Sequence, residues 1–207
     1  MGDRDAAVIF VGALLLMLPV SSVSCTQTPF HEALFTSVSA VCVTGLVLQD
    51  TGSYWSSFGQ AVILLLIQTG GLGVITVAVS FAILSGRKIS LMQRSTMQDA
   101  ISAPKIGGIV RLTKFSVQGT LFIELLGMPA MLPVFFRDYG IKGIWMAAFH
   151  SVSAFCNAGF DLLGTSSQPF VSLSRYIANP LINLVIKLLI IISVLGYLNS
   201  EEINTHK

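Results

Sequence analysis

The sequence predicts an all-α membrane protein made of two tandem units of one design. Three observations support this prediction. The chain is 53% hydrophobic and only 11% charged, whereas soluble domains carry about 25% charged residues. Four apolar segments are candidates for membrane-spanning helices. A motif of small residues also occurs twice, and each copy lies between two of these apolar segments.

The first apolar segment, residues 6–20, is short. It has 15 residues, whereas the second segment, 61–84, has 24 and forms a helix of roughly 36 Å, enough to cross a bilayer with tilt. An alternative for 6–20 is a cleaved secretory signal, because Arg4 precedes it and small residues lead up to Cys25. The second unit argues against this alternative, since its outer span stands at a similar distance before its own motif. The four predicted spans are 6–20, 61–84, 115–136 and 180–198.

The repeated motif has the layout of a pore loop. Residues 33–47 read ALFTSVSAVCVTGLV and residues 147–161 read AAFHSVSAFCNAGFD, with eight identities at an offset of 114. In each copy a stretch too short to cross the membrane, 31–41 or 144–155, precedes a turn that contains glycine. Irregular backbone at membrane depth is tolerated where it is buried in protein or lines a watery path. The alternative is a pair of ordinary packing turns, which the recurrence in matching context disfavours.

The two turns, 42–46 and 156–160, have residues suited to binding a cation. Glycine adopts left-handed dihedrals without steric cost, so it lets successive carbonyls point the same way. Carbonyl oxygens aimed at an axis replace the water around a dehydrated cation, as they do in potassium-channel filters. We therefore interpret the turns as filter loops.

The charge pattern predicts the topology. Residues 85–114 hold six Lys and Arg residues against one acid, Asp99, while residues 21–58 hold no Lys or Arg. Short loops rich in Lys and Arg stay in the cytoplasm. We therefore expect this linker and both termini inside the cell, with both pore loops entering from outside. The predicted fold class is two tandem parallel helix–pore-loop–helix repeats of a potassium-channel-like pore, with domains 1–84, 85–114 and 115–207.

Four stretches of the chain resemble one known family. They read SAVCVTGLVLQDTGS (39–53), ILLLIQTGGLGVIT (63–76), FHSVSAFCNAGFDLLG (149–164) and NPLINLVIKLLII (179–191). They resemble the membrane pore subunit of the Trk/Ktr/HKT superfamily of potassium transporters. The resemblance implies that four such units surround one pore, of which this chain resembles the N-terminal half. It implies a first filter of Val43, Thr44 and Gly45 and a second filter of Asn157, Ala158 and Gly159.

The resemblance also implies a function and its partners. It implies uptake of K⁺ across the plasma (inner) membrane by carbonyl coordination, with no enzymatic activity and no bound cofactor. Gly45 stands where sodium transporters of the plant branch have serine, which favours K⁺. The implied partners are membrane lipid, a second copy or companion half that completes a four-loop pore, and a cytoplasmic nucleotide-binding regulatory subunit, with no nucleic acid. The alternative is a truncated, non-conducting half that only inserts and assembles with a companion chain.

Five further polar side chains are candidates for roles near the filters. Asp50 follows the first filter and Asp161 follows the second, and each either adds negative potential at the outer mouth or is a solvated loop acid. Glu124 and Lys187 lie within predicted spans, where an unpaired charge is costly, and we expect them to pair or to contact polar backbone. Direct handling of the ion by Glu124 is the alternative. An intramembrane enzyme would need such facing polar groups, and these two alone come close. We expect His150 to pack behind the second filter.

Overall fold

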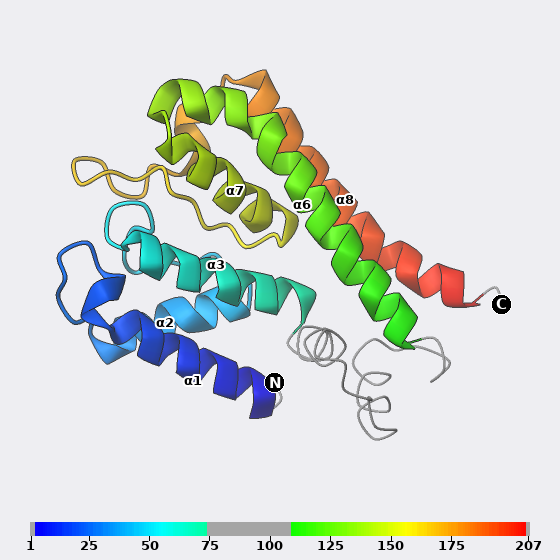
Figure 1. Ribbon diagram of the computed structural model, residues 1–207, viewed down its shortest axis with the longest axis horizontal. Coiled ribbons are helices and arrows are strands. Elements are labelled where there is room, and N and C mark those ends of the chain that lie inside the picture. Colours follow the sequence, from blue (N-terminus) through cyan, green and yellow to red (C-terminus); the bar gives the residue numbers. More distant parts are fainter. Residues whose placement is uncertain (1–2, 74–108, 206–207) are drawn as a thin grey trace.

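The computed structural model describes residues 3–73 and 109–205, and these residues form helices and loops with no strand (Figure 1). The all-α prediction is therefore confirmed for this part of the chain. The predicted domain boundary at 84/85 and the linker as far as residue 108 lie outside the described residues.

The first unit consists of α1 (Asp3–Met17), the 3₁₀ helix η1 (Pro19–Ser21), α2 (Phe30–Val41) and α3 (Ser57–Leu72). Pro29 precedes α2, and its fixed φ suits a helix start. The Ser56 hydroxyl caps α3 by accepting a hydrogen bond from the Gly59 N–H at 3.2 Å. The helix ends at Gly73, whose φ of 81° favours glycine.

The second unit consists of α6 (Ile109–Tyr139), α7 (Lys142–Phe155), the 3₁₀ helix η2 (Ser172–Tyr176) and α8 (Pro180–Thr205). α6 begins ahead of the predicted start at residue 115, so the end of the predicted linker is helical. Asn179 caps α8, because its side-chain oxygen accepts hydrogen bonds from the N–H groups of Leu181 and Ile182 at 3.1 and 3.2 Å. Within the described residues, each unit therefore has the order first helix, short helix (α2 or α7), loop and last helix.

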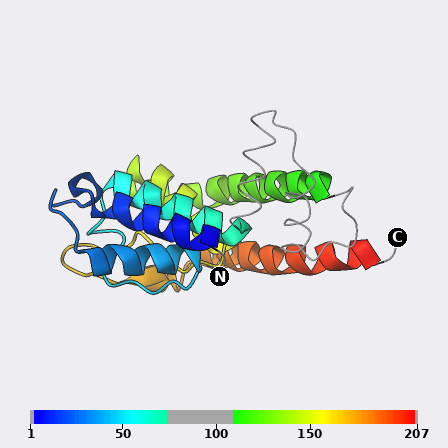
Figure 2. The ribbon, with the colours of Figure 1, turned by 90° about the horizontal axis from the view of Figure 1, so that it is seen from below.

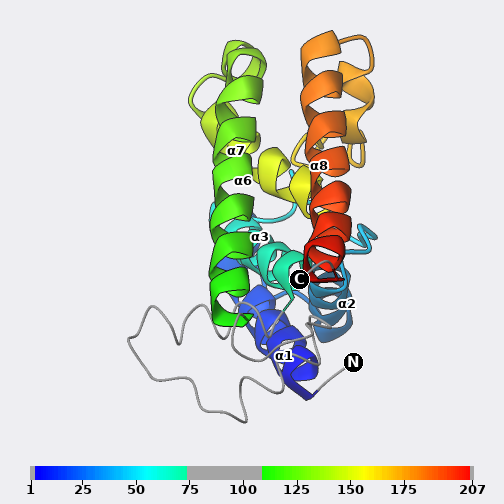
Figure 3. The ribbon, with the colours of Figure 1, turned by 90° about the vertical axis from the view of Figure 1, so that its right-hand side faces the viewer.

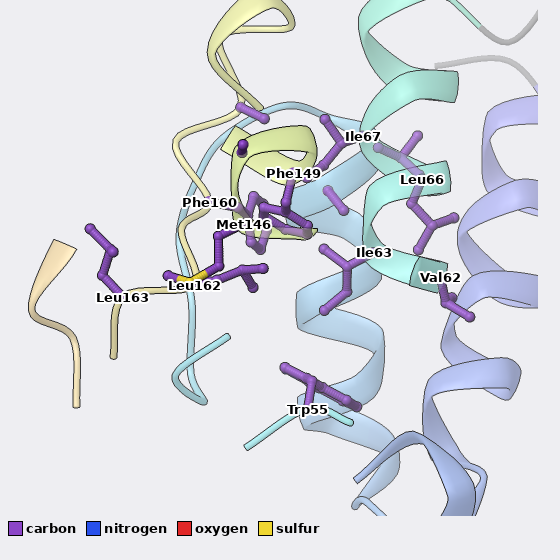
Figure 4. Packing of buried hydrophobic residues seen from close by; sticks show 14 of the residues in the cluster. Trp55, Val62, Ile63, Leu66, Ile67, Met146, Phe149, Phe160, Leu162 and Leu163 are labelled. Atoms are coloured by element: carbon purple, nitrogen blue, oxygen red, sulfur yellow. The ribbon is translucent and has the colours of Figure 1, made fainter. Parts of the chain in front are cut away.

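The helices pack within each unit and then unit against unit. The three α-helices of each unit contact one another, and α3 of the first unit packs on α7 of the second. Figure 4 shows that Ile63 and Ile67 of α3 point toward Phe149 of α7, while Val62 and Leu66 point toward α1. All five side chains are buried, so α3 contributes to the core with two faces and joins the units.

The helices α6 and α8 extend together beyond the first unit (Figure 2). Figure 3 shows them side by side, with α7 between them. Their outer faces are apolar, and Phe122, Leu125 and Leu184 are 62%, 66% and 58% exposed. Such a surface suits lipid or another apolar protein face.

One helix in the described part of the chain, over Ser116–Tyr139, is long and apolar enough to cross a membrane by length and composition. Three other apolar helices are shorter, namely Asp5–Met17, Ser57–Leu72 and Pro180–Leu195. Within the described residues, the helix over predicted span 115–136 is therefore the one that reaches full length, and predicted span 61–84 lies partly outside those residues.

Candidate functional site

The loops that follow α2 and α7 share one backbone conformation. Val43 and Asn157, at equivalent positions, have φ values of 54° and 55°. Gly45 and Gly159, two residues further on, have φ values of 73° and 72°. Side-chain-bearing residues seldom adopt positive φ. The two loops therefore repeat in their φ values as well as in their sequence.

Equivalent hydrogen bonds close the two loops. The N–H of Thr44 donates to the Ser39 carbonyl at 2.9 Å, and the N–H of Ala158 donates to the Ser153 carbonyl at 2.8 Å. The serine side chains then differ. Ser39 shares a hydrogen bond with the Thr44 hydroxyl at 2.8 Å, whereas Ser153 donates to the Phe160 carbonyl at 2.6 Å. Each loop is thus fastened to the end of its own short helix.

The two loops meet backbone to backbone. A Cβ atom placed on Gly45 would lie 2.7 Å from the Ala158 carbonyl oxygen and 3.3 Å from the Cα of Gly159. Gly45 therefore needs to be glycine both for its positive φ and for this close approach. A cavity of about 170 Å³ opens beside the loops. Its lining includes Gly45, Gly159 and the two acids that follow the loops, Asp50 and Asp161.

Asp50 connects the loop after α2 in the first unit with the loop after α7 in the second. Its Oδ2 accepts hydrogen bonds from the N–H and the hydroxyl of Ser53 at 2.8 and 2.7 Å, and its Oδ1 accepts one from the N–H of Phe170 at 2.9 Å. The side chain is 5% exposed. Gly164, the repeat counterpart of Asp50, leaves room for the carboxylate because any Cβ there would overlap it. Asp50 is therefore a buried acid bound to backbone, and the solvated-acid interpretation is wrong for it.

Asp161 is less tightly held. Its Oδ1 accepts one hydrogen bond from the N–H of Leu163 at 3.0 Å. Burial raises the pKa of Asp161 above the ordinary aspartate value, the Leu163 hydrogen bond lowers it, and the charge of Asp50 adds to the rise. Of the two acids that line the cavity, Asp161 has fewer hydrogen bonds.

His150 lies on α7, the short helix that precedes the second loop. Its ring stacks on Phe135 of α6 with centroids 5.1 Å apart, and its Nδ1 lies 2.7 Å from the Met146 carbonyl oxygen. The side chain is buried. It packs the short helix against α6.

A serine fastens each short helix to the long helix before it. The Ser37 hydroxyl donates to the Ile9 carbonyl on α1 at 2.7 Å, and the Ser151 hydroxyl donates to the Glu124 carbonyl on α6 at 2.7 Å. Ser37 and Ser151 are repeat equivalents. Both are buried, so each bond satisfies groups that have no access to water.

Two glycines make this approach possible. A Cβ on Gly12 of α1 would lie 2.6 Å from the Ser37 hydroxyl, and a Cβ on Gly127 of α6 would collide with the Ser151 hydroxyl. Sequence reasoning missed both glycines. The one available signal was the similar spacing, since Gly12 stands 25 residues before Ser37 and Gly127 stands 24 residues before Ser151.

The predicted pair of Glu124 and Lys187 is wrong. The Glu124 carboxylate is 5% exposed and accepts a hydrogen bond from Gln68 Nε2 of the first unit at 3.1 Å. Its other oxygen lies 3.9 Å from the Cys156 Sγ. Lys187 is exposed on α8, and the ion pairs within the described residues are His31–Glu32 and Arg137–Asp138. Sequence could not show that Glu124 faces the neighbouring unit.

Gln60 makes a second polar bridge between the units. Its Oε1 accepts a hydrogen bond from the indole Nε1 of Trp145 on α7 at 2.8 Å. Its Nε2 donates to the carbonyls of Trp55 and Thr51 at 3.0 and 3.3 Å. Gln60 and Gln68 are two turns apart on α3, so one face of this helix provides both bridges.

Comparison with known proteins defines the class of protein as cation transport proteins. The model of the TrkH family, described as a cation transport protein, matches residues 5–198. Because the match covers nearly the whole chain, the chain belongs to the TrkH family, whose members are transporters and not enzymes.

The chain is similar to several uptake proteins. It is 42% identical over 159 residues to the potassium/sodium uptake protein NtpJ of Enterococcus hirae, covering 76% of this chain and 35% of that protein. It is 40% identical over 190 residues to the Ktr system potassium uptake protein B of Bacillus subtilis, covering 91% and 41%. It is 35% identical over 191 residues to the protein of the same name from Vibrio alginolyticus, covering 92% and 40%. The chain thus spans 35–41% of the length of these relatives.

Proposed function

We propose that this chain contributes to K⁺ uptake across the plasma membrane as part of a pore subunit, with its two loops forming part of the selectivity filter. The observation that supports this most is the pairing of Gly45 with Gly159, which have the same φ and approach backbone to backbone. The relatives are named for uptake of potassium, or of potassium and sodium. The proposed ligands are the backbone carbonyls of residues 43–45 and 157–159.

The loop conformation suits carbonyl coordination. In each loop, two residues with positive φ (43 and 45, or 157 and 159) stand on either side of a residue whose φ is not positive. A backbone that alternates in this way can turn successive carbonyls to one side, where they can replace the water of a dehydrated cation. The short helices α2 and α7 end immediately before the loops. Their carbonyl ends carry partial negative charge, which favours a cation there.

The proposed pore needs further loops. Two loops cannot surround a dehydrated ion, and the relatives are more than twice as long as the matched region. We propose that a second copy or a companion half completes a four-loop ring. The exposed apolar side chains of α6 and α8 then face lipid or that companion. A cytoplasmic nucleotide-binding subunit acting on the basic linker, 85–114, completes the proposed assembly.

An uptake experiment tests this function. K⁺ uptake is measured in transport-deficient cells that express the chain alone, the chain with a companion carrying two further units, and the companion alone. We expect uptake above background with the chain and companion together. Insertion and assembly without any K⁺ uptake would show instead that the chain is a non-conducting half.

A further inference from the structure

Glu124 makes contacts with three parts of the molecule at once. Its backbone carbonyl accepts the hydrogen bond from Ser151 of α7 at 2.7 Å. Its carboxylate accepts the hydrogen bond from Gln68 of α3 at 3.1 Å and lies 3.9 Å from the thiol of Cys156. Cys156 is the residue between α7 and the second loop. One residue of α6 therefore touches the short helix, the start of the second loop and the neighbouring unit.

The three side chains form a closed cluster, which we call the junction cluster: Gln68, Glu124 and Cys156. The Cys156 Sγ lies 4.0 Å from the Gln68 Oε1, so each member contacts the other two. Gly71, one turn after Gln68, packs on the same thiol, because a Cβ there would lie 2.5 Å from its sulfur. The end of α3 thus packs closely against Cys156.

The first unit shows that the fold of a unit does not require this cluster. Ile9 is the counterpart of Glu124, since its carbonyl accepts the equivalent serine hydrogen bond at 2.7 Å. Its side chain is apolar, and Cys42, the counterpart of Cys156, is exposed. The first loop nevertheless has positive φ at the same two positions as the second. The carboxylate therefore serves the contact between units and not the folding of one unit.

The free-energy cost of burying the Glu124 carboxylate also indicates that this side chain has a function. Glu124 is 5% exposed within an apolar helix, and its partners are an amide and a thiol. A buried acid whose partners in the described part of the chain are neutral is costly, and such residues in membrane helices are commonly functional.

We propose that Glu124 is a positioning residue for the second filter loop. It fixes Cys156 against Gln68 of the first unit and so sets how closely Gly159 faces Gly45. This inference rests on the proposed function, because it assumes that the loops select the ion. Displacing Cys156 shifts the adjoining residue, Asn157, which holds a positive φ and has little freedom to adjust.

The test measures the ratio of K⁺ to Na⁺ uptake, per amount of protein in the membrane, for the full chain with its companion half. Glu124→Leu removes both side-chain contacts, and we expect the ratio to fall about twofold to tenfold, the range for loss of one or two hydrogen bonds. Glu124→Gln keeps an accepting oxygen for Gln68 and places an amide N–H where the second oxygen was, so we expect a smaller fall. Cys156→Ala removes one thiol with little change in volume and serves as the test if Glu124→Leu does not reach the membrane.

Trp145→Phe is the matched control. It breaks the other polar bridge between the units, the hydrogen bond to Gln60, without touching the second loop. We expect it to leave the ratio unchanged. An equal fall for Trp145→Phe would show general loosening of the contact between units and would overturn the inference. An equal fall for Glu124→Gln and Glu124→Leu would show that charge matters and position does not, and would overturn it too.

Gly159→Ser separates this inference from the proposed function. If Gly159→Ser lowers the ratio while Glu124→Leu and Cys156→Ala do not, the filter assignment stands and the positioning role is wrong. If all three leave the ratio unchanged in an assembly that transports K⁺, the proposed function is wrong and the positioning role with it.

Discussion

Asp50 in the first unit accepts a hydrogen bond from the backbone N–H of Phe170 in the second, at 2.9 Å, across 120 positions of the chain. The same carboxylate also accepts two hydrogen bonds from Ser53. Asp50 therefore holds together the loops of the two units beside the cavity that Gly45 and Gly159 line.

We predict that Asp50→Asn destabilises the protein. An amide provides one accepting oxygen where the carboxylate provides two, so a buried N–H loses its partner, at a cost of about 1–3 kcal/mol. Thermal melting in detergent measures the loss. Asp161→Asn is the control, because Asp161 accepts a single hydrogen bond and is less buried. Equal melting temperatures for the two variants would contradict the assigned role of Asp50.

We predict that Gly12→Ala and Gly127→Ala each destabilise the protein, by about 1–3 kcal/mol, the usual cost of overpacking. The new methyl group would meet the hydroxyl of Ser37 or Ser151, which fastens the short helix. Gly119→Ala on α6 is the control, because nothing lies within 4 Å of its added Cβ. Chemical denaturation or thermal melting should therefore separate the first two variants from the third. Three equal effects would show that helix propensity alone is being measured.

We predict that Lys187→Met is close to neutral for stability and does not rescue Glu124→Gln. Lys187 is exposed, and Glu124 has Gln68 and Cys156 as partners. Independent sites give additive losses. Melting temperatures of the two single variants and the double variant test this. A double variant more stable than Glu124→Gln alone would show that the two residues interact.

We predict that residues 85–114 face the cytoplasm, because they hold six of the twelve Lys and Arg residues. Cysteines introduced at Ser90 and Ser102 should resist an impermeant thiol reagent added outside intact cells. Native Cys25, which is exposed in the loop after α1, is the positive control for the outer side. Prompt labelling at Ser90→Cys would invert the proposed topology.

The local features of the loops were predictable from the sequence. The eight identities between 33–47 and 147–161 predicted two short helices ending in glycine turns, and α2 and α7 end where those turns begin. A repeated motif fixes local backbone well, since the same residues face the same constraints twice.

Contacts between the units were not predictable in the same way. Nothing near Phe170 in the sequence marks its N–H as the partner of Asp50. The prediction that Glu124 pairs with Lys187 followed from charge alone. In the structure, the orientation of the helices places Glu124 against Gln68 and leaves Lys187 exposed. The start of α6 at Ile109 was also missed, because basic residues marked that region as linker although Arg and Lys are good helix formers.

The central claim is tested most directly by the ion selectivity of Gly45→Ser. Selectivity is measured as the ratio of K⁺ to Na⁺ uptake in a transporting assembly of the chain with its companion half. A side chain at either glycine opposes a positive φ, of 73° or 72°. At Gly45 it also meets the Ala158 carbonyl oxygen, whereas at Gly159 it meets only the Cα of Gly45, at 3.4 Å. We therefore predict that Gly45→Ser weakens the preference for K⁺ more than it lowers the amount of protein, and that Gly159→Ser does so more mildly. An unchanged ratio in both variants, with transport intact, would show that these loops are not the filter.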